Sequence, residues 1–221
     1  MKSLVLIGGC NFHNHENKLI HKKIIDLSKK AKPSLLYIHV SDKNLSDIID
    51  TFNEFDVDLK IYEKLTDIDS ADIIYIGGGN TENMIKRFDK EGITKKLIEN
   101  LDKKIICGVS AGAIFWFSKF YSDTYSYSDN FNAYNFKLLD GIGYFKPYIC
   151  PHYNEPGKEM FSEELGNNFG IALENNTALF ISDDSIDFVL DRKNAAIYYY
   201  EDKVLNVLND DNKINILKNL F

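Results

Sequence analysis

The chain has 221 residues, of which 44% are hydrophobic, 27% charged and 13% aromatic, and its formal net charge is −7. This length fits one α/β domain, and the composition excludes wholesale disorder. The 26 basic residues are dispersed, with no run longer than a pair. Nucleic acids and anionic membrane surfaces are therefore disfavoured as partners.

The cysteines and the N-terminal residues indicate the compartment. Three widely spaced cysteines, at positions 10, 107 and 150, match neither a disulfide framework nor a zinc site. The apolar run at 4–7 is too short for the core of a signal peptide. No stretch approaches the roughly 20 apolar residues that span a bilayer. We expect a cytoplasmic protein.

The first half of the chain alternates short apolar runs with stretches of helical periodicity. Strands are expected at 3–7, 34–40, 59–62, 73–76 and 105–109. Helices are expected at 16–31, 45–52, 81–88 and 93–101, with another directly after residue 110. Continuous apolar strands separated by helices are typical of a parallel sheet covered on both faces.

The second half shows closely spaced strand patterns. Residues 118–136 are rich in Tyr, Ser, Asn and Asp and predict a long loop, or strands joined by one. Short strands are expected at 171–173, 178–181, 186–190, 195–200 and 204–208, with hairpin turns at 191–194 and 201–203. The predicted fold is a three-layer α/β domain with a mostly parallel sheet and antiparallel C-terminal strands. No linker or repeat interrupts the chain, so residues 1–221 are expected to form a single domain.

A G-x-S-x-G segment, Gly108-Val-Ser110-Ala-Gly112, lies between a predicted strand and a predicted helix. This context is typical of a nucleophile elbow, in which a strained turn presents the serine at the carboxyl end of the sheet. The N–H of Ala111, at the start of the helix, is placed to stabilise an oxyanion. The alternative interpretation is a small-residue turn that serves only close packing.

A nucleophilic serine needs a base and a group that orients the base. Only one of the five histidines follows Ser110; it is His152, in Pro151-His152-Tyr153. Glu174, which ends an apolar run before an Asn-Asn turn, is the first candidate for the orienting carboxylate. The alternatives are Asp123, Asp129 and Asp140.

Two further loops belong to the same predicted sheet edge. Residues 77–81, Gly-Gly-Gly-Asn-Thr, follow a strand, and glycines let backbone approach a ligand. Thr81 is placed to cap the next helix, and the absence of a Lys-Ser/Thr pair disfavours a nucleotide loop. The segment 10–15, with one cysteine and two histidines, is expected to be a polar loop at the mouth of the site.

Several of these segments together resemble peptidase family S51, the family of aspartyl dipeptidases (peptidase E) and cyanophycinases. The matching blocks are Ile76-Gly-Gly-Gly-Asn-Thr81, Gly108-Val-Ser-Ala-Gly-Ala113 and Pro151-His152-Tyr153, with a looser match at Gly170-Ile-Ala-Leu-Glu174. The resemblance spans residues 4–181. It implies a fold similar to class I glutamine amidotransferases and a triad of Ser110, His152 and Glu174. It also implies an oxyanion- and substrate-binding site that includes Gly79, Asn80 and Ala111.

The implied activity is hydrolysis of short peptides, as in a dipeptidase, with no metal or cofactor, by a monomer or homodimer. Family members specific for N-terminal aspartate carry an arginine after the catalytic histidine, whereas here the nearest cation is Lys158. We therefore expect no strict Asp-X specificity and a preference for a neutral or basic N-terminal residue. The alternatives are a serine esterase or amidase with the same triad, or a catalytically inactive, amidotransferase-like ligand-binding domain.

Overall fold

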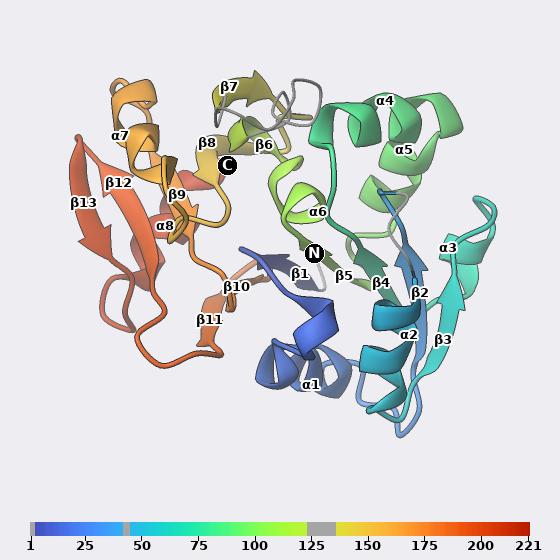
Figure 1. Cartoon of the computed structure of the whole chain (residues 1–221). Helices are drawn as coiled ribbons and strands as arrows, with labels where there is room; N and C mark the ends of the chain where they lie inside the picture. Colours follow the sequence, from blue (N-terminus) through green and yellow to red (C-terminus); the bar gives the residue numbers. More distant parts are fainter. Residues whose placement is uncertain (1–2, 42–44, 123–135) are drawn as a thin grey trace.

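The computed structural model describes residues 3–41, 45–122 and 136–221. It contains two β-sheets (Figure 1). The larger sheet has seven strands in the order β11-β10-β1-β5-β4-β2-β3. Its strands are β1 (Ser3–Ile7), β2 (Ser34–Ile38), β3 (Asp58–Ile61), β4 (Ile73–Ile76), β5 (Ile105–Val109), β10 (Thr177–Ile181) and β11 (Ile186–Leu190). β1 to β5 run parallel, and β10 and β11 form an antiparallel edge.

Helices cover both faces of this sheet because alternate residues of each buried strand point to opposite sides. On one face, apolar strand residues pack against α1 (Lys18–Asp26) and α2 (Ser46–Asn53). On the other face they pack against α3 (Asp67–Ser70), α4 (Thr81–Glu91), α5 (Ile93–Ile98) and α6 (Ala111–Ile114). The predicted parallel core with helices on both sides is confirmed.

A second sheet was not expected from the sequence. Its six strands, in the order β13-β12-β9-β8-β6-β7, lie beside the first sheet (Figure 1). They are β6 (Phe117–Ser122), β7 (Lys137–Asp140), β8 (Phe145–Cys150), β9 (Gly170–Leu173), β12 (Ile197–Glu201) and β13 (Val204–Val207). Two further helices, α7 (Phe161–Glu164) and α8 (Lys213–Asn219), belong to this half of the chain, and one apolar cluster includes residues of both sheets.

The two expected C-terminal hairpins have different outcomes. Residues 201–203 do form the turn of the β12–β13 hairpin, with Asp202 and Lys203 at φ values of 50° and 67°. The hairpin expected at 191–194 is wrong, because β11 pairs with β10 in the first sheet and β12 pairs with β9 in the second. This segment instead carries the chain from one sheet to the other.

The remaining short segments complete the architecture around the elbow. The helix expected after Ser110 is α6, which is a single turn, because the aromatic run that follows it enters β6. Within the described residues, 3₁₀ turns occur at Phe12–Asn14 and Lys158–Met160. None of the helices within the described ranges has the length and apolar character needed to cross a bilayer.

Candidate active site

Ser110 occupies a sharp turn between β5 and α6, near the centre of the larger sheet. Its backbone has φ 52° and ψ −114°, a conformation that side-chain-bearing residues rarely adopt. The turn is held by hydrogen bonds from Ser110 N–H to Ile7 O (3.0 Å) and from Ala113 N–H to Ser110 O (2.9 Å). A Cβ atom on Gly108 would overlap the carbonyl oxygen of Gly112, so the glycines permit the strand and the helix to approach this closely.

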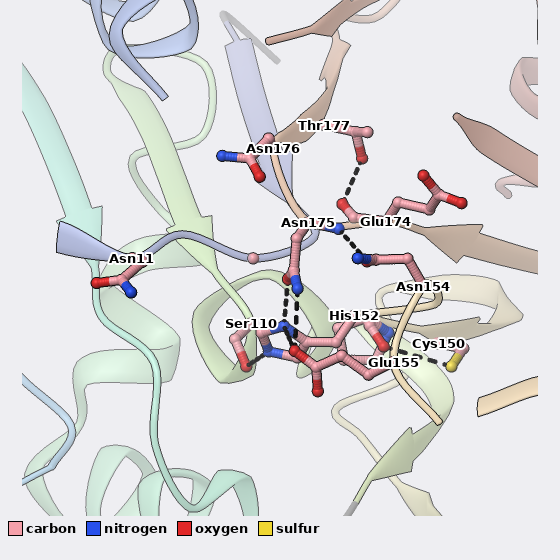
Figure 2. A network of polar contacts seen from close by, with 12 residues as sticks. Asn11, Ser110, Cys150, His152, Asn154, Glu155, Glu174, Asn175, Asn176 and Thr177 are labelled. Carbon is pink, nitrogen blue, oxygen red and sulfur yellow. Dashed lines mark hydrogen bonds and ion pairs between the residues drawn. The ribbon is translucent and has the colours of Figure 1, made fainter. Parts of the chain in front are cut away.

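His152 follows β8 and reaches Ser110 from the second sheet (Figure 2). Its Nε2 atom lies 2.8 Å from Ser110 Oγ, which is hydrogen-bonding distance. The histidine backbone has φ 54°, and its N–H donates to Gly8 O at 3.2 Å. In this geometry the serine hydroxyl donates to Nε2, so the imidazole is placed to take its proton.

The other imidazole nitrogen is contacted by an amide. His152 Nδ1 lies 2.5 Å from Asn175 Oδ1, and Asn175 Nδ2 donates to Glu155 Oε1 at 2.9 Å. Because the bond to Glu155 uses the amide nitrogen, the amide oxygen faces the imidazole and accepts from Nδ1–H. Glu155 Oε1 is itself 3.5 Å from Nδ1 and places a negative charge beside the ring. These contacts fix the tautomer in which Nε2 is free to act as a base.

Glu174 does not occupy the position expected for it. Its carboxylate accepts from Ala196 N–H at 3.0 Å and from Tyr198 O–H at 3.3 Å. Figure 2 shows its side chain pointing away from His152, whereas the next residue, Asn175, points toward it. Consecutive residues in extended chain face opposite sides, so a shift of one position exchanges the two side chains.

The alternative carboxylates can be placed only in part. Asp140, on β7, forms an ion pair with Lys119 across the β6–β7 pair, at 2.5 Å. Asp123 and Asp129 lie outside the described residues. The sequence did not predict the group at Nδ1, because a carboxylate was expected there and the contacting residue is an asparagine.

The glycine loop after β4 approaches the nucleophile. A Cβ atom on Gly78 would lie 3.3 Å from Ser110 Cβ, and both Gly78 and Gly79 line the adjacent cleft. Asn80 is the N-cap of α4, where its side chain accepts from Asn83 N–H at 2.9 Å. The cap expected from Thr81 is therefore supplied by Asn80, and Thr81 is the first residue of the helix.

Ala111 is the first residue of α6, directly after the nucleophile. The first N–H groups of a helix have no acceptor within the helix. The N–H of Ala111 is therefore available to a ligand held at Ser110.

Backbone at Gly9, after β1, forms the wall behind the imidazole. A Cβ atom on Gly9 would overlap Asn175 Oδ1 and lie 2.5 Å from His152 Nδ1. Glycine is needed here for close approach and not for an unusual φ, because Gly9 is not among the positive-φ residues. The sequence showed Gly8 and Gly9 as a strand end without indicating this contact.

A cleft of about 690 Å³ opens beside Ser110 and His152. Its walls come from the loops after β1, β2, β4 and β5, and from the segments near β8 and β10. The expected polar loop contributes Cys10, Asn11, Phe12 and His13. Burial raises the pKa of the Cys10 thiol, with a further increase from Glu16 and Asp191, so this thiol is a poor nucleophile.

The cations of the site differ from those expected. Arg192 lines the cleft, although it is distant in sequence from the histidine. Lys158, by contrast, is almost fully buried outside the cleft lining, with Nζ 4.3 Å from the ring centroid of Phe136 and 5.9 Å from that of Tyr121. Lys158 therefore does not screen the cleft, and sequence proximity to His152 was a misleading guide to it.

Comparisons with known proteins agree with this geometry. A family model described as peptidase family S51 matches residues 4–189. The chain is 25% identical over 218 residues to the uncharacterized peptidase YgaJ of Bacillus subtilis (strain 168). This alignment covers 90% of the chain and 91% of YgaJ.

Solved structures show the same fold. A Listeria monocytogenes EGD-e protein assigned as a peptidase E has a TM-score of 0.64 at 17% identity, covering 86% of this chain and 98% of its own. A peptidase from an acI-B1 Actinobacterium has a TM-score of 0.67 at 17% identity, covering 94% and 93%. The architecture is thus the class I glutamine amidotransferase-like α/β fold of peptidase E structures.

Proposed function

Because the chain belongs to peptidase family S51 and is a serine peptidase, we propose that it hydrolyses short peptides with Ser110 as nucleophile and His152 as general base. The observation that carries this proposal is the 2.8 Å contact between Ser110 Oγ and His152 Nε2 beside the cleft. Nucleophile and base within hydrogen-bond reach are the minimal arrangement for acyl transfer.

The chemistry then proceeds in two steps. His152 Nε2 takes the hydroxyl proton as Ser110 Oγ attacks the scissile carbonyl carbon, and it returns that proton to the nitrogen of the leaving residue. His152 Nε2 then deprotonates a water molecule, which attacks the carbonyl carbon of the acyl-enzyme. The bond to Ser110 Oγ breaks, the proton returns from Nε2 to this oxygen, and the product carboxylate leaves.

Backbone groups beside Ser110 supply the oxyanion site in this proposal. The N–H of Ala111 at the start of α6 and the N–H of Gly79 in the glycine loop stabilise the negative oxygen of the tetrahedral intermediate. The closeness of Gly78 to Ser110 Cβ supports this assignment. Asn80 contributes by fixing the end of the loop, because its side chain caps α4.

Orientation of the base is assigned to Asn175 and Glu155. The Asn175 amide fixes the Nδ1–H tautomer, and the Glu155 carboxylate, 3.5 Å from Nδ1, stabilises the imidazolium that forms during the reaction. Glu174 supports the site indirectly, since its contacts with Ala196 and Tyr198 attach the segment before Asn175 to the second sheet.

Charges in the cleft support a preference for short peptides with a neutral or basic N-terminal residue. The lining residues include three carboxylates, on Glu16, Asp47 and Glu155, and one Lys or Arg side chain, on Arg192. An acidic side chain bound near these carboxylates would experience repulsion in a partly desolvated site. The cleft volume of about 690 Å³ is within the range typical of small-molecule sites.

The test is a panel of Ala-Leu, Lys-Leu and Asp-Leu assayed with wild-type protein and with Ser110→Ala. We expect hydrolysis of Ala-Leu and Lys-Leu, with kcat lower by roughly a thousandfold or more in the variant, because the nucleophile is removed. Near-normal turnover by Ser110→Ala would exclude the scheme. A preference for Asp-Leu of more than about tenfold would overturn the proposed specificity.

A fluorophosphonate probe provides an independent check of the nucleophile. Labelling is expected on Ser110 in the wild type and is lost in Ser110→Ala, while Cys10 and Cys150 remain unlabelled. Failure of Ser110 to react would contradict its activation by His152.

A further inference from the structure

Arg192 is the only lysine or arginine among the described residues that line the cleft. It is exposed, and its guanidinium forms no ion pair or hydrogen bond with the part of the chain that the structure describes. The other arginine, Arg87, lies on α4, 3.9 Å from Glu91. A guanidinium has five N–H donors, so Arg192 presents unused donors to whatever occupies the cleft.

The carboxylates of the cleft are already engaged. Glu16 Oε2 accepts from Asn11 N–H and Asn176 Nδ2, at 3.1 and 3.0 Å. Asp47 lies 3.6 Å from His13, and Glu155 accepts from Asn175. None of them is an ion-pair partner of Arg192.

The backbone at Arg192 is anchored on the histidine side of the cleft. Asp191 N–H donates to Asn176 O at 2.8 Å, and Asn176 directly follows the residue that contacts His152 Nδ1. The Asp191 carboxylate accepts from Leu19 N–H at the start of α1, at 2.8 Å, which holds the turn from a second direction. The position of this arginine therefore depends on the same segment that orients the imidazole.

The histidine side of the cleft is the side of the leaving group. In the proposed reaction, His152 Nε2 protonates the nitrogen of the residue that departs, so that residue must lie next to the imidazole. In a dipeptide, the departing residue carries a free α-carboxylate. A guanidinium binds a carboxylate through paired, charge-assisted hydrogen bonds.

We propose that Arg192 binds a carboxylate of the peptide, namely the free C-terminal carboxylate of the leaving residue, and so selects substrates cleaved one residue before their C-terminus. This inference rests on the proposed peptidase function. It adds the residue that recognises the C-terminal end of the bound peptide. It accounts for Arg192 being the one Lys or Arg side chain among the described residues of a cleft that also carries three carboxylates.

The test measures binding separately from turnover. The affinities of Ala-Leu and of Ala-Leu amide are determined by calorimetry with the Ser110→Ala protein, which holds uncleaved peptide, and with Ser110→Ala/Arg192→Ala. We expect the first protein to bind the free acid at least about tenfold more tightly than the amide, and the second to bind the two ligands equally. Ser110→Ala/Lys193→Ala is the matched control, because it removes a neighbouring cation that does not line the cleft, and it is expected to keep the discrimination.

A second arm distinguishes the two possible sources of the carboxylate. The affinities of Asp-Leu and Asn-Leu are compared on the same proteins. If Ser110→Ala binds Asp-Leu more tightly than Asn-Leu and Arg192→Ala abolishes this difference, the arginine binds an acidic side chain, and the C-terminal assignment is overturned. Equal binding of Ala-Leu and its amide to Ser110→Ala would also overturn it. Since binding is measured in a protein without the nucleophile, these results stand apart from any failure of the wild type to hydrolyse dipeptides.

Discussion

A neutral amide contacts His152 Nδ1 at 2.5 Å, and the Glu155 carboxylate, which is bonded to that amide, lies 3.5 Å from the same nitrogen. An amide oxygen fixes the tautomer as well as a carboxylate does, but it carries no full charge to stabilise an imidazolium. The charge comes instead from the half-exposed Glu155, where solvent weakens the electrostatic interaction. The proposed division of the two roles between Asn175 and Glu155 departs physically from a triad with one orienting carboxylate.

Two substitutions separate Asn175 from its neighbour. Asn175→Ala is expected to lower kcat by roughly ten- to a hundredfold, because the imidazole loses the acceptor that fixes its tautomer. Glu174→Gln should change kcat only a few-fold, since a glutamine oxygen can still accept from Ala196 N–H. Both are measured as kcat and KM for Ala-Leu, with Asn175→Asp as the conservative replacement that retains an acceptor. A larger loss in Glu174→Gln than in Asn175→Ala would return the orienting role to Glu174.

Local sequence signals singled out Ser110 and His152, which the structure brings into contact, because each has a distinctive setting, a small-residue elbow and a strand end. They could not identify Asn175, because a single residue of register decides whether Glu174 or Asn175 faces the imidazole. The sequence also did not predict that Arg192 lines the cleft. Its position there depends on the path of the chain from the first sheet to the second, which a local sequence pattern does not indicate.

At the scale of secondary structure, the end of β1 determines how closely the histidine loop can approach. Gly9 backbone lies against both His152 and Asn175. We expect Gly9→Ala to lower kcat/KM at least about a hundredfold, because the added methyl group displaces both side chains from a site where small misplacements are costly. Circular dichroism before the kinetic assay establishes whether the variant is folded.

Gly143→Ala is the control for this substitution. Its Cβ would meet no atom within 4 Å, but its φ of 69° makes any side chain unfavourable. It should therefore lower stability by about 1 kcal/mol while activity is retained. Equal activity losses in the two variants would show that Gly9 acts through general stability alone.

The parallel arrangement of the first strands was predictable because four buried apolar runs alternate with helices, a pattern typical of a parallel sheet covered on both faces. The second sheet was not predictable in the same way. Short strand patterns after residue 170 show that strands exist, but β10 and β11 join one sheet and β9, β12 and β13 join the other. Pairing of this kind is decided by long-range packing and not by local pattern.

Across the whole molecule, the packing of α1 and α2 on the larger sheet makes stability depend on pH. His21 is almost fully buried among aromatic rings, 3.2 Å from Tyr75 O–H, and burial lowers the pKa of His21 to about 4. An unfolded chain, with a histidine pKa near 6.5, binds a proton in the range between these values, whereas the folded protein does not. This group therefore destabilises the fold as the pH decreases from about 6.5 toward 4.

We expect His21 to account for a loss of roughly 2 kcal/mol in the free energy of unfolding between pH 7.5 and pH 5. His21→Phe should remove that part of the pH dependence, whatever its effect on stability at pH 7.5. The measurement is urea unfolding at both pH values. Phe52→Leu, at a ring whose centroid lies 5.3 Å from that of His21, serves as the control because it should lower stability equally at both pH values. An unchanged slope in His21→Phe would contradict the buried, neutral state of this histidine.

The backbone of Ser110, at φ 52° and ψ −114°, is close to the mirror image of an extended conformation. Glycine adopts such mirror-image conformations without penalty, whereas any other residue pays about 1–3 kcal/mol to remain there. The best residue for folding at this position is therefore one that cannot perform the reaction. With Ser110 as the proposed nucleophile, activity and stability favour different residues at position 110.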